Sequence, residues 1–105
     1  MPMITADTGI ITQINVFTVP EGEQQALIDL LTEAALACRT VPGWISASLH
    51  RSLDGTRVVN YAQAGDREAM VRIFERLREG GFLERNRALG EAHPGLYEVA
   101  MTLEK

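Results

Sequence analysis

Two polar side chains near the middle of the chain, His50 and Asn60, are of types that carry out acid–base and anion-binding chemistry. An imidazole can accept and return a proton near neutral pH. A side-chain amide can donate a hydrogen bond to an oxygen on which negative charge develops. In an extended strand Asn60 shares its face with Ala62 and Ala64, whose small side chains leave room beside it. The two polar groups together are of the types that transfer a proton and bind an oxyanion.

Structural roles explain the same residues without chemistry. His50 alternates with two serines, so a half-buried, hydrogen-bonded histidine is an alternative interpretation. Asn60 can likewise serve a neighbouring backbone group, although an amide among Val and Tyr is uncommon in a strand. Trp44 favours core packing, and Cys38 favours a small buried hydrophobe. Both kinds of interpretation stay open from the residues alone.

The N-terminal half of the chain predicts a strand followed by a helix. Residues 10–19, IITQINVFTV, are rich in β-branched side chains, which are typical of strands. Within residues 21–41 apolar side chains recur at steps of three and four, as on one face of a helix. Glu21 and Glu23 are expected in the first turn, where the helix dipole favours acidic side chains. Val41-Pro42-Gly43 then ends the helix.

A β-hairpin is predicted next, with a type I′ turn at Asp54-Gly55. Its first strand, WISASLHRSL, alternates, and this alternation predicts that Trp44 shares one face with Ser46, Ser48 and His50. Its second strand is TRVVNYAQA, residues 56–64. The two strands are expected to pair antiparallel.

The C-terminal part predicts two helical segments and a last strand. Asp66 is a good N-cap for a helix whose apolar stripe runs from Ala69 to Leu77. Gly80-Gly81 interrupts that helix, and a short helical piece at residues 82–92 follows. His93-Pro94-Gly95 is expected to break the chain before a final strand at residues 96–104.

The predicted order β-α-β-β-α-β is that of an α+β, ferredoxin-like protomer. Such a protomer has a four-stranded antiparallel sheet with both helices on one face. The other face would carry Val, Ile and Tyr side chains, which need a cover. A second copy of the chain is the simplest cover, so a homodimer with its sheets packed face to face is expected.

Composition excludes several classes of protein. A chain of 105 residues predicts a single domain at 1–105, and a net charge of −4 without a basic block argues against nucleic-acid binding. The N-terminus shows neither a signal peptide nor a membrane anchor, and a lone cysteine suits the cytoplasm. No metal-ligand spacing, P-loop or dinucleotide fingerprint is apparent, so no metal and no nucleotide cofactor are expected.

The middle of the chain resembles a known family. The stretch from Val41 to Trp44, then His50, the DGT run from Asp54 and the VVNYAQ run around Asn60 are similar to the antibiotic biosynthesis monooxygenase domain. The resemblance is greatest to cofactor-independent, quinone-forming oxygenases that oxidise anthrones in aromatic polyketide pathways. It implies a dimeric α+β barrel with a ligand cavity between helices and sheet, a small aromatic polyketide as ligand, and no cofactor.

The resemblance also implies roles for single residues. Asn60 and His50 would be catalytic, the amide holding the substrate oxyanion and the imidazole taking the proton. Ala64 stands where similar enzymes carry a catalytic tryptophan, and Met70 stands where they carry a tyrosine. Five residues are expected to contact the substrate: Asn15, Trp44, Ala64, Met70 and Arg85.

Two other functions stay open beside oxygenation. The two aromatic positions that are not filled motivate a dimeric protein that binds the ligand without oxygenating it, or an accessory factor. A cyclase in the same cavity would use Asn60 and His50 on an enolising ketone without O₂. Haem cleavage is a poor candidate, because only Asn15 matches the residues that haem-degrading relatives use.

Overall fold

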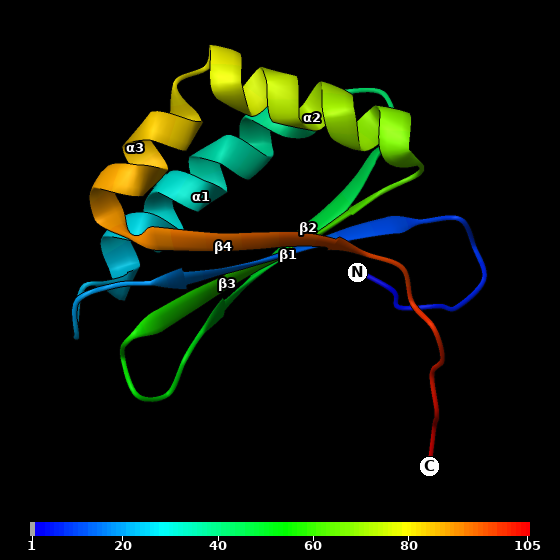
Figure 1. Ribbon diagram of the computed structural model, residues 1–105, viewed down its shortest axis with the longest axis horizontal. Coiled ribbons are helices and arrows are strands. Elements are labelled where there is room, and N and C mark those ends of the chain that lie inside the picture. Colours follow the sequence, from blue (N-terminus) through cyan, green and yellow to red (C-terminus); the bar gives the residue numbers. More distant parts are fainter. Residues whose placement is uncertain (1) are drawn as a thin grey trace.

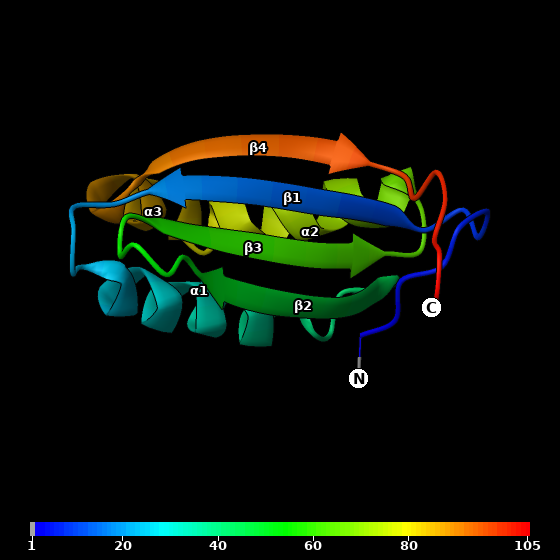
Figure 2. The same cartoon turned by 90° about the horizontal axis from the view of Figure 1, so that it is seen from below.

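The computed structural model describes residues 2–105 and has the predicted α+β, ferredoxin-like fold (Figure 1). A sheet of four antiparallel strands has the order β2-β3-β1-β4. All helices lie on one face of it, and Figure 2 shows the other face with no helix over it. The elements are β1 Ile11–Thr18, α1 Gln24–Cys38, β2 Trp44–Arg51, β3 Arg57–Ala64, α2 Arg67–Glu79, α3 Phe82–Leu89 and β4 Glu91–Tyr97. No described helix is long and apolar enough to cross a membrane.

Helix α1 begins three residues later than its acidic residues predict. Glu21 lies before the helix, Glu23 is its N-cap without a side-chain hydrogen bond, and the first turn contains no acidic residue. The prediction that both glutamates lie in the first turn is therefore wrong. Gln24 anchors this end instead, because its amide donates to the backbone oxygens of Ser52 at 3.0 Å and Arg57 at 2.9 Å.

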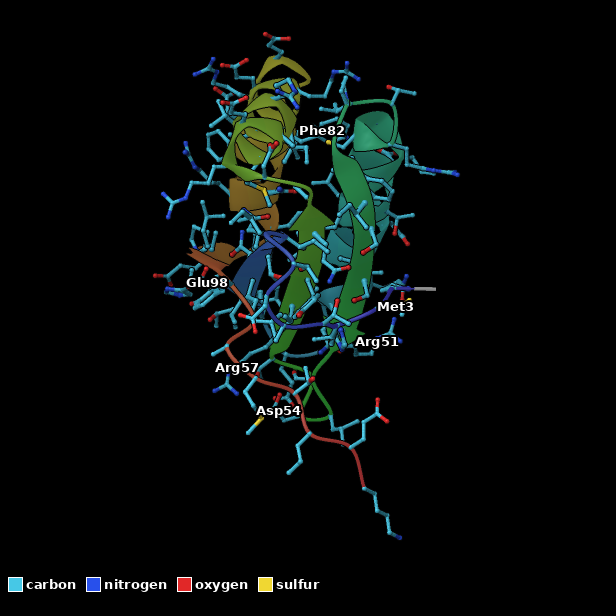
Figure 3. All side chains as sticks on the ribbon, turned by 90° about the vertical axis from the view of Figure 1, so that its right-hand side faces the viewer. Met3, Arg51, Asp54, Arg57, Phe82 and Glu98 are labelled. Atoms are coloured by element: carbon cyan, nitrogen blue, oxygen red, sulfur yellow. The ribbon has the colours of Figure 1, made fainter. Side chains whose placement is uncertain are left out.

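The hairpin between β2 and β3 is confirmed, but its turn is not of type I′. The loop spans residues 52–56, and Gly55 alone in it has a positive φ, of 82°. The carboxylate of Asp54 accepts hydrogen bonds from the Thr56 and Ser52 hydroxyls and from the Thr56 amide, which lower its pKa to about 2. Figure 3 shows Asp54 on the side of the sheet away from the helix layer that Phe82 marks.

A β-bulge at the start of β2 changes the face on which Trp44 lies. Trp44 pairs with Ala64 and Ser46 pairs with the adjacent Gln63, so Ile45 is the extra residue. Trp44 therefore joins the helix-facing side of the sheet and packs against buried residues of α1 and α2. The prediction that Trp44 shares a face with Ser46, Ser48 and His50 is wrong for this reason.

Both C-terminal helices form where the sequence predicts them. The Asp66 carboxylate accepts a hydrogen bond from the Ala69 amide at 2.7 Å and caps α2. Gly81, with a φ of 75°, makes the bend from α2 into α3. Helix α3 ends at Leu89, which is earlier than predicted, because the last strand begins at Glu91.

The last strand lies earlier in the chain than predicted. Strand β4 contains His93, Pro94 and Gly95, which the sequence indicates as a break, whereas residues 98–105 form no strand. β4 is at the edge of the sheet and pairs only with β1, so a proline without an N–H group is tolerated there. The C-terminal segment leaves the sheet after Tyr97 (Figure 1).

The core is divided into two clusters on the helix-facing side of the sheet. One is built around Phe17, Val19, Leu27, Leu31 and Val58. The other joins Ala64 to Cys38, Val41, Ala69, Met70 and Ile73, with Trp44, Ile11 and Leu77 packed against it. Ala64 has no exposed surface, so the position holds no empty space.

We predict that Trp44 and Ala64 share one volume of the core. Ala64→Trp should destabilise the protein by about 1 to 3 kcal/mol through overpacking, and Trp44→Ala by up to about 3 kcal/mol through lost packing. In the double variant the loss should be smaller than the sum by about 0.5 kcal/mol or more, because the new ring fills the vacated space. Urea unfolding of the four proteins measures this coupling.

Ile45→Ala is the matched control, since Ile45 is the 43 % exposed neighbour at the bulge and is not part of the cluster. Its effect should add to that of Ala64→Trp. If the losses of stability in Trp44→Ala and Ala64→Trp also add in the double variant, the two side chains do not share one volume of the core.

Candidate functional site

A cavity of about 170 Å³ lies between the helix-facing side of the sheet and the helices. Every strand and every helix contributes to its wall. Most of the wall is apolar, and four alanines at positions 34, 35, 47 and 62 make the space. The remaining apolar lining is Phe17, Leu31, Cys38, Trp44, Ile73, Phe74, Leu77, Leu83, Ala92 and Pro94. The cavity is therefore a site for a largely apolar ligand.

The polar part of this wall consists mainly of side-chain amides. Asn15 and Asn60 lie directly opposite each other on the paired strands β1 and β3, and Asn86 comes from α3. Asn15 is tied to the sheet, since its Oδ1 accepts a hydrogen bond from the His93 amide at 3.1 Å. The Oδ1 atoms of Asn60 and Asn86 are buried and have no hydrogen-bond partner among residues 2–105. A buried acceptor without a partner costs about 1 to 3 kcal/mol, so both amides are suited to a ligand's polar groups.

The cavity contains little that titrates near neutral pH. Burial raises the pKa of the Cys38 thiol against the opposing effect of Arg76, so the thiol that lines the wall stays protonated. Arg87, at the exposed rim, is the single charged side chain among the described lining residues. No described carboxylate or imidazole lines the inner cavity. The wall can therefore hydrogen-bond an anion more readily than it can take a proton.

His50 is not brought together with Asn60. It pairs with Val59 in the sheet, so it lies on the face opposite to Asn60, which pairs with Leu49. There its ring is exposed, and its Nε2 atom is 3.3 Å from the Ser48 hydroxyl. The expectation that His50 and Asn60 act in one cavity does not fit the geometry of a single chain.

The five expected substrate contacts divide into two groups. Asn15 and Trp44 line the inner cavity, and Met70 lines the groove outside it. Ala64 is covered by core side chains and reaches neither space. Arg85 lies outside both, where it forms an ion pair with Glu33 at 3.2 Å. Ala64 and Arg85 are thus not brought together with the other three expected contacts in a single chain.

The inner cavity continues into an open groove of about 650 Å³ between α2 and β4. Gln13, Ile73, Phe74, Leu77 and Pro94 line both spaces. The groove is mostly apolar, and its charged lining residues are Arg67, Glu75 and Arg78. Binding pockets for drug-sized ligands are about 300 to 1,000 Å³, and the inner cavity and the groove together fall in this range.

The sequence did not indicate Asn86 and Gln13 as lining residues. Asn86 lies in FLERNRAL, whose charges indicate an exposed helix. The only available signal was its spacing of three residues from Leu83 and from Leu89, which puts it on the inward stripe of α3. No group of three or more His, Cys, Asp or Glu within residues 2–105 is placed to hold a metal ion.

Solved structures with the same fold include oxygenases. SnoaB from Streptomyces nogalater, described as a cofactor-independent oxygenase, has a TM-score of 0.80 at 24 % identity over 92 % of this chain and 99 % of its own, a likeness in fold. A monooxygenase from the gene ActVA-Orf6 of Streptomyces coelicolor, in complex with nanaomycin D, has a TM-score of 0.80 at 28 % identity. That match covers 93 % of each chain.

Sequence comparison gives the family. Tetracenomycin-F1 monooxygenase of Streptomyces glaucescens is 41 % identical over 64 residues, which are 60 % of this chain and 57 % of that protein. The aligned part thus spans little more than half of this relative. The profile of the antibiotic biosynthesis monooxygenase family matches residues 10–72, from β1 into α2, and includes Asn15 and Asn60. Because this match covers more than half of the chain, the protein belongs to the antibiotic biosynthesis monooxygenase family.

Proposed function

We propose that this protein is a cofactor-independent monooxygenase that uses O₂ to oxidise an anthrone-like, polycyclic aromatic polyketide. The observation that carries the proposal is the unpartnered amide of Asn60 in an apolar cavity between sheet and helices. Family membership and the names of the relatives, among them monooxygenases and a complex with nanaomycin D, support the reaction type and the ligand class.

The chemistry that the cavity supports is stabilisation of an enolate. An anthrone loses a proton from its ring methylene, and the negative charge moves to its carbonyl oxygen. The Asn60 amide, turned so that its NH₂ group faces the ligand, donates a hydrogen bond to that oxygen. The electron-rich enolate then reacts with O₂ at the former methylene carbon. One oxygen atom becomes the new carbonyl, and the other leaves as water with the two methylene hydrogens.

The proton has no side-chain acceptor in the inner cavity, where carboxylates and imidazoles are absent among the described lining residues. We infer that water in the open groove takes it. Arg87 at the rim adds a positive charge that favours the anion over the neutral ketone. The protein accordingly lowers the energy of the enolate and orients it, without a base in the inner cavity.

A second candidate function is ligand binding without oxygenation, as an accessory protein or as a cyclase. The observations that favour it are the buried alanine at position 64 and the methionine at position 70, neither of which offers a polar or aromatic group to a substrate. A cyclase would polarise a ketone through Asn60 and consume no O₂. Oxygen uptake therefore separates it from the monooxygenase.

We predict that the protein accelerates the oxidation of dithranol, an anthrone with two phenolic hydroxyls, to its quinone with uptake of O₂. Asn60→Ala should lower kcat by about 10²-fold, the usual effect of removing one oxyanion donor. His50→Ala should retain the activity, because its side chain lies on the other face of the sheet. An oxygen electrode together with the quinone absorbance measures both.

Quinone formation at the buffer rate by the natural protein would refute the monooxygenase for this substrate class. An equal loss in His50→Ala and Asn60→Ala would show that His50 reaches the substrate, which a single chain does not allow. Leu53→Ala, in the exposed loop at 106 % relative exposure, is the matched surface control.

The open face of the sheet leads to a proposal about assembly. Ile14 and Tyr61 pair across β1 and β3 on this face, as do Val16 and Val59, and all four are only half-buried. The N-terminal segment covers a small part of the face, where the carbonyl of Met3 accepts a hydrogen bond from Gln63 at 2.7 Å. A second copy, presenting the same β-branched face, would cover the rest, so we propose a homodimer.

We predict that light scattering after size-exclusion chromatography gives twice the chain mass of 11.6 kDa at micromolar concentration. Val16→Glu should shift the protein towards the monomer, because it places a charge in the buried interface. Leu53→Glu, in the exposed hairpin loop, should leave the mass unchanged. A natural protein that is monomeric under these conditions would rule out the homodimer.

A further inference from the structure

Asn86 is a buried polar residue that the fold itself does not use. It lies on α3 with 7 % of its surface exposed, and it is the only buried residue of that helix. Its backbone carbonyl accepts the Gly90 amide at 3.0 Å, a bond that any residue would provide. Its side-chain Oδ1 is buried without a partner among residues 2–105. The amide therefore neither caps the helix nor bridges two elements.

An unpartnered buried amide is a stability cost that a leucine of similar size would avoid. Leu83 and Leu89 occupy the positions three residues before and after Asn86 on the same helix, so the stripe is otherwise apolar. Asn86 also lines the inner cavity. A buried polar side chain that packing does not explain thus belongs to the wall of the cavity.

Asn60 and Asn86 reach this cavity from opposite sides. Asn60 comes from β3 in the sheet, and Asn86 comes from α3 in the helix layer that covers the sheet (Figure 1). A flat ring system that lies between these two side chains can form a hydrogen bond with Asn60 at one edge and with Asn86 at the other. Both Oδ1 atoms lack partners, so the inner cavity has two separate unmet hydrogen-bonding sites and not one.

We propose that Asn86 is a specificity-determining residue that accepts a hydrogen bond from a phenolic hydroxyl of the ligand while Asn60 holds the ligand's carbonyl oxygen. This inference rests on the proposed function for the ligand class, and it adds that the ligand carries a hydroxyl on the edge facing α3. A neutral hydroxyl fits this site, because the one charged lining residue, Arg87, lies at the rim. Asn86 then selects hydroxylated over unsubstituted polycyclic ketones.

Binding can be measured without turnover, since Trp44 is the sole tryptophan of the chain and lines the same cavity. Quenching of its fluorescence reports occupancy by 2,6-dihydroxyanthraquinone at pH 6, where its two phenolic hydroxyls keep their protons and lie away from the carbonyls, and by unsubstituted anthraquinone. Asn86→Leu should weaken binding of the dihydroxyquinone about tenfold, the value of one buried hydrogen bond, and leave anthraquinone binding unchanged. Asn86→Ser, which keeps an acceptor, should restore part of the preference for the dihydroxyquinone.

Stability provides a readout that separates ligand contact from a structural role. Asn86→Leu should unfold in urea at the same or a higher concentration than the natural protein, because it removes an unpaired buried acceptor. Glu84→Leu, at an exposed position of α3, is the matched control and should bind both quinones as the natural protein does.

Three results would overturn the inference: equal loss of both quinones in Asn86→Leu, no loss of either, or no preference for the dihydroxyquinone in the natural protein. Oxygen uptake with dithranol keeps the proposed function separate. If the natural protein consumes no O₂ but its preference for the dihydroxyquinone depends on Asn86, the monooxygenase fails and the binding role of Asn86 stands. If the natural protein oxidises dithranol and Asn86→Leu binds both quinones as the natural protein does, the monooxygenase stands and the binding role of Asn86 fails.

Discussion

The antiparallel register between β1 and β3 is the constraint on which the site depends. These are the two central strands, and their pairing sets Asn15 opposite Asn60 and Gln13 opposite Ala62, all on the side that the helices cover. Side chains alternate along a strand with a period of two, so a slip of one residue would present Val59 to the cavity and Asn60 to the open face. The amide chemistry of the cavity is therefore a consequence of strand register.

The sequence predicts well what local patterns determine. The two main helices follow from their apolar spacing and from the Asp66 cap, and the order of elements follows from strand composition and glycine breaks. Prediction from the sequence fails where the local structure depends on pairing with residues that are distant in the sequence. The bulge at Ile45 is a mismatch between β2 and β3, and β4 passes through Pro94 because only one of its edges is paired. Neither the bulge nor the path of β4 through Pro94 can be predicted from residues that are close in the sequence.

The same division holds for the site. Asn60 is proposed from the sequence because a strand amide among apolar neighbours is unusual, and Asn15 because it matches an asparagine of related families. Both residues line the inner cavity. His50 is misplaced although the sequence holds the information, because a two-residue turn at Asp54-Gly55 already pairs His50 with Val59, as the structure does, and so puts it on the face opposite to Asn60. Asn86 is missed because one inward polar residue in a charged helix resembles its exposed neighbours. Only the packing of α3 in the folded protein shows that Asn86 is the buried polar residue of this helix.

The bulge changes the interpretation of Ala64, which stands where similar enzymes carry a catalytic tryptophan. The bulge turns Trp44 onto the helix-facing side, opposite Ala64, so the indole packs where a large side chain at position 64 would otherwise lie. A small residue at position 64 is then required by packing and does not leave a hole. The room for a ligand comes instead from Ala34, Ala35, Ala47 and Ala62. Ala64 is therefore evidence about how this core is filled, and the case for chemistry rests on the two unpaired amides.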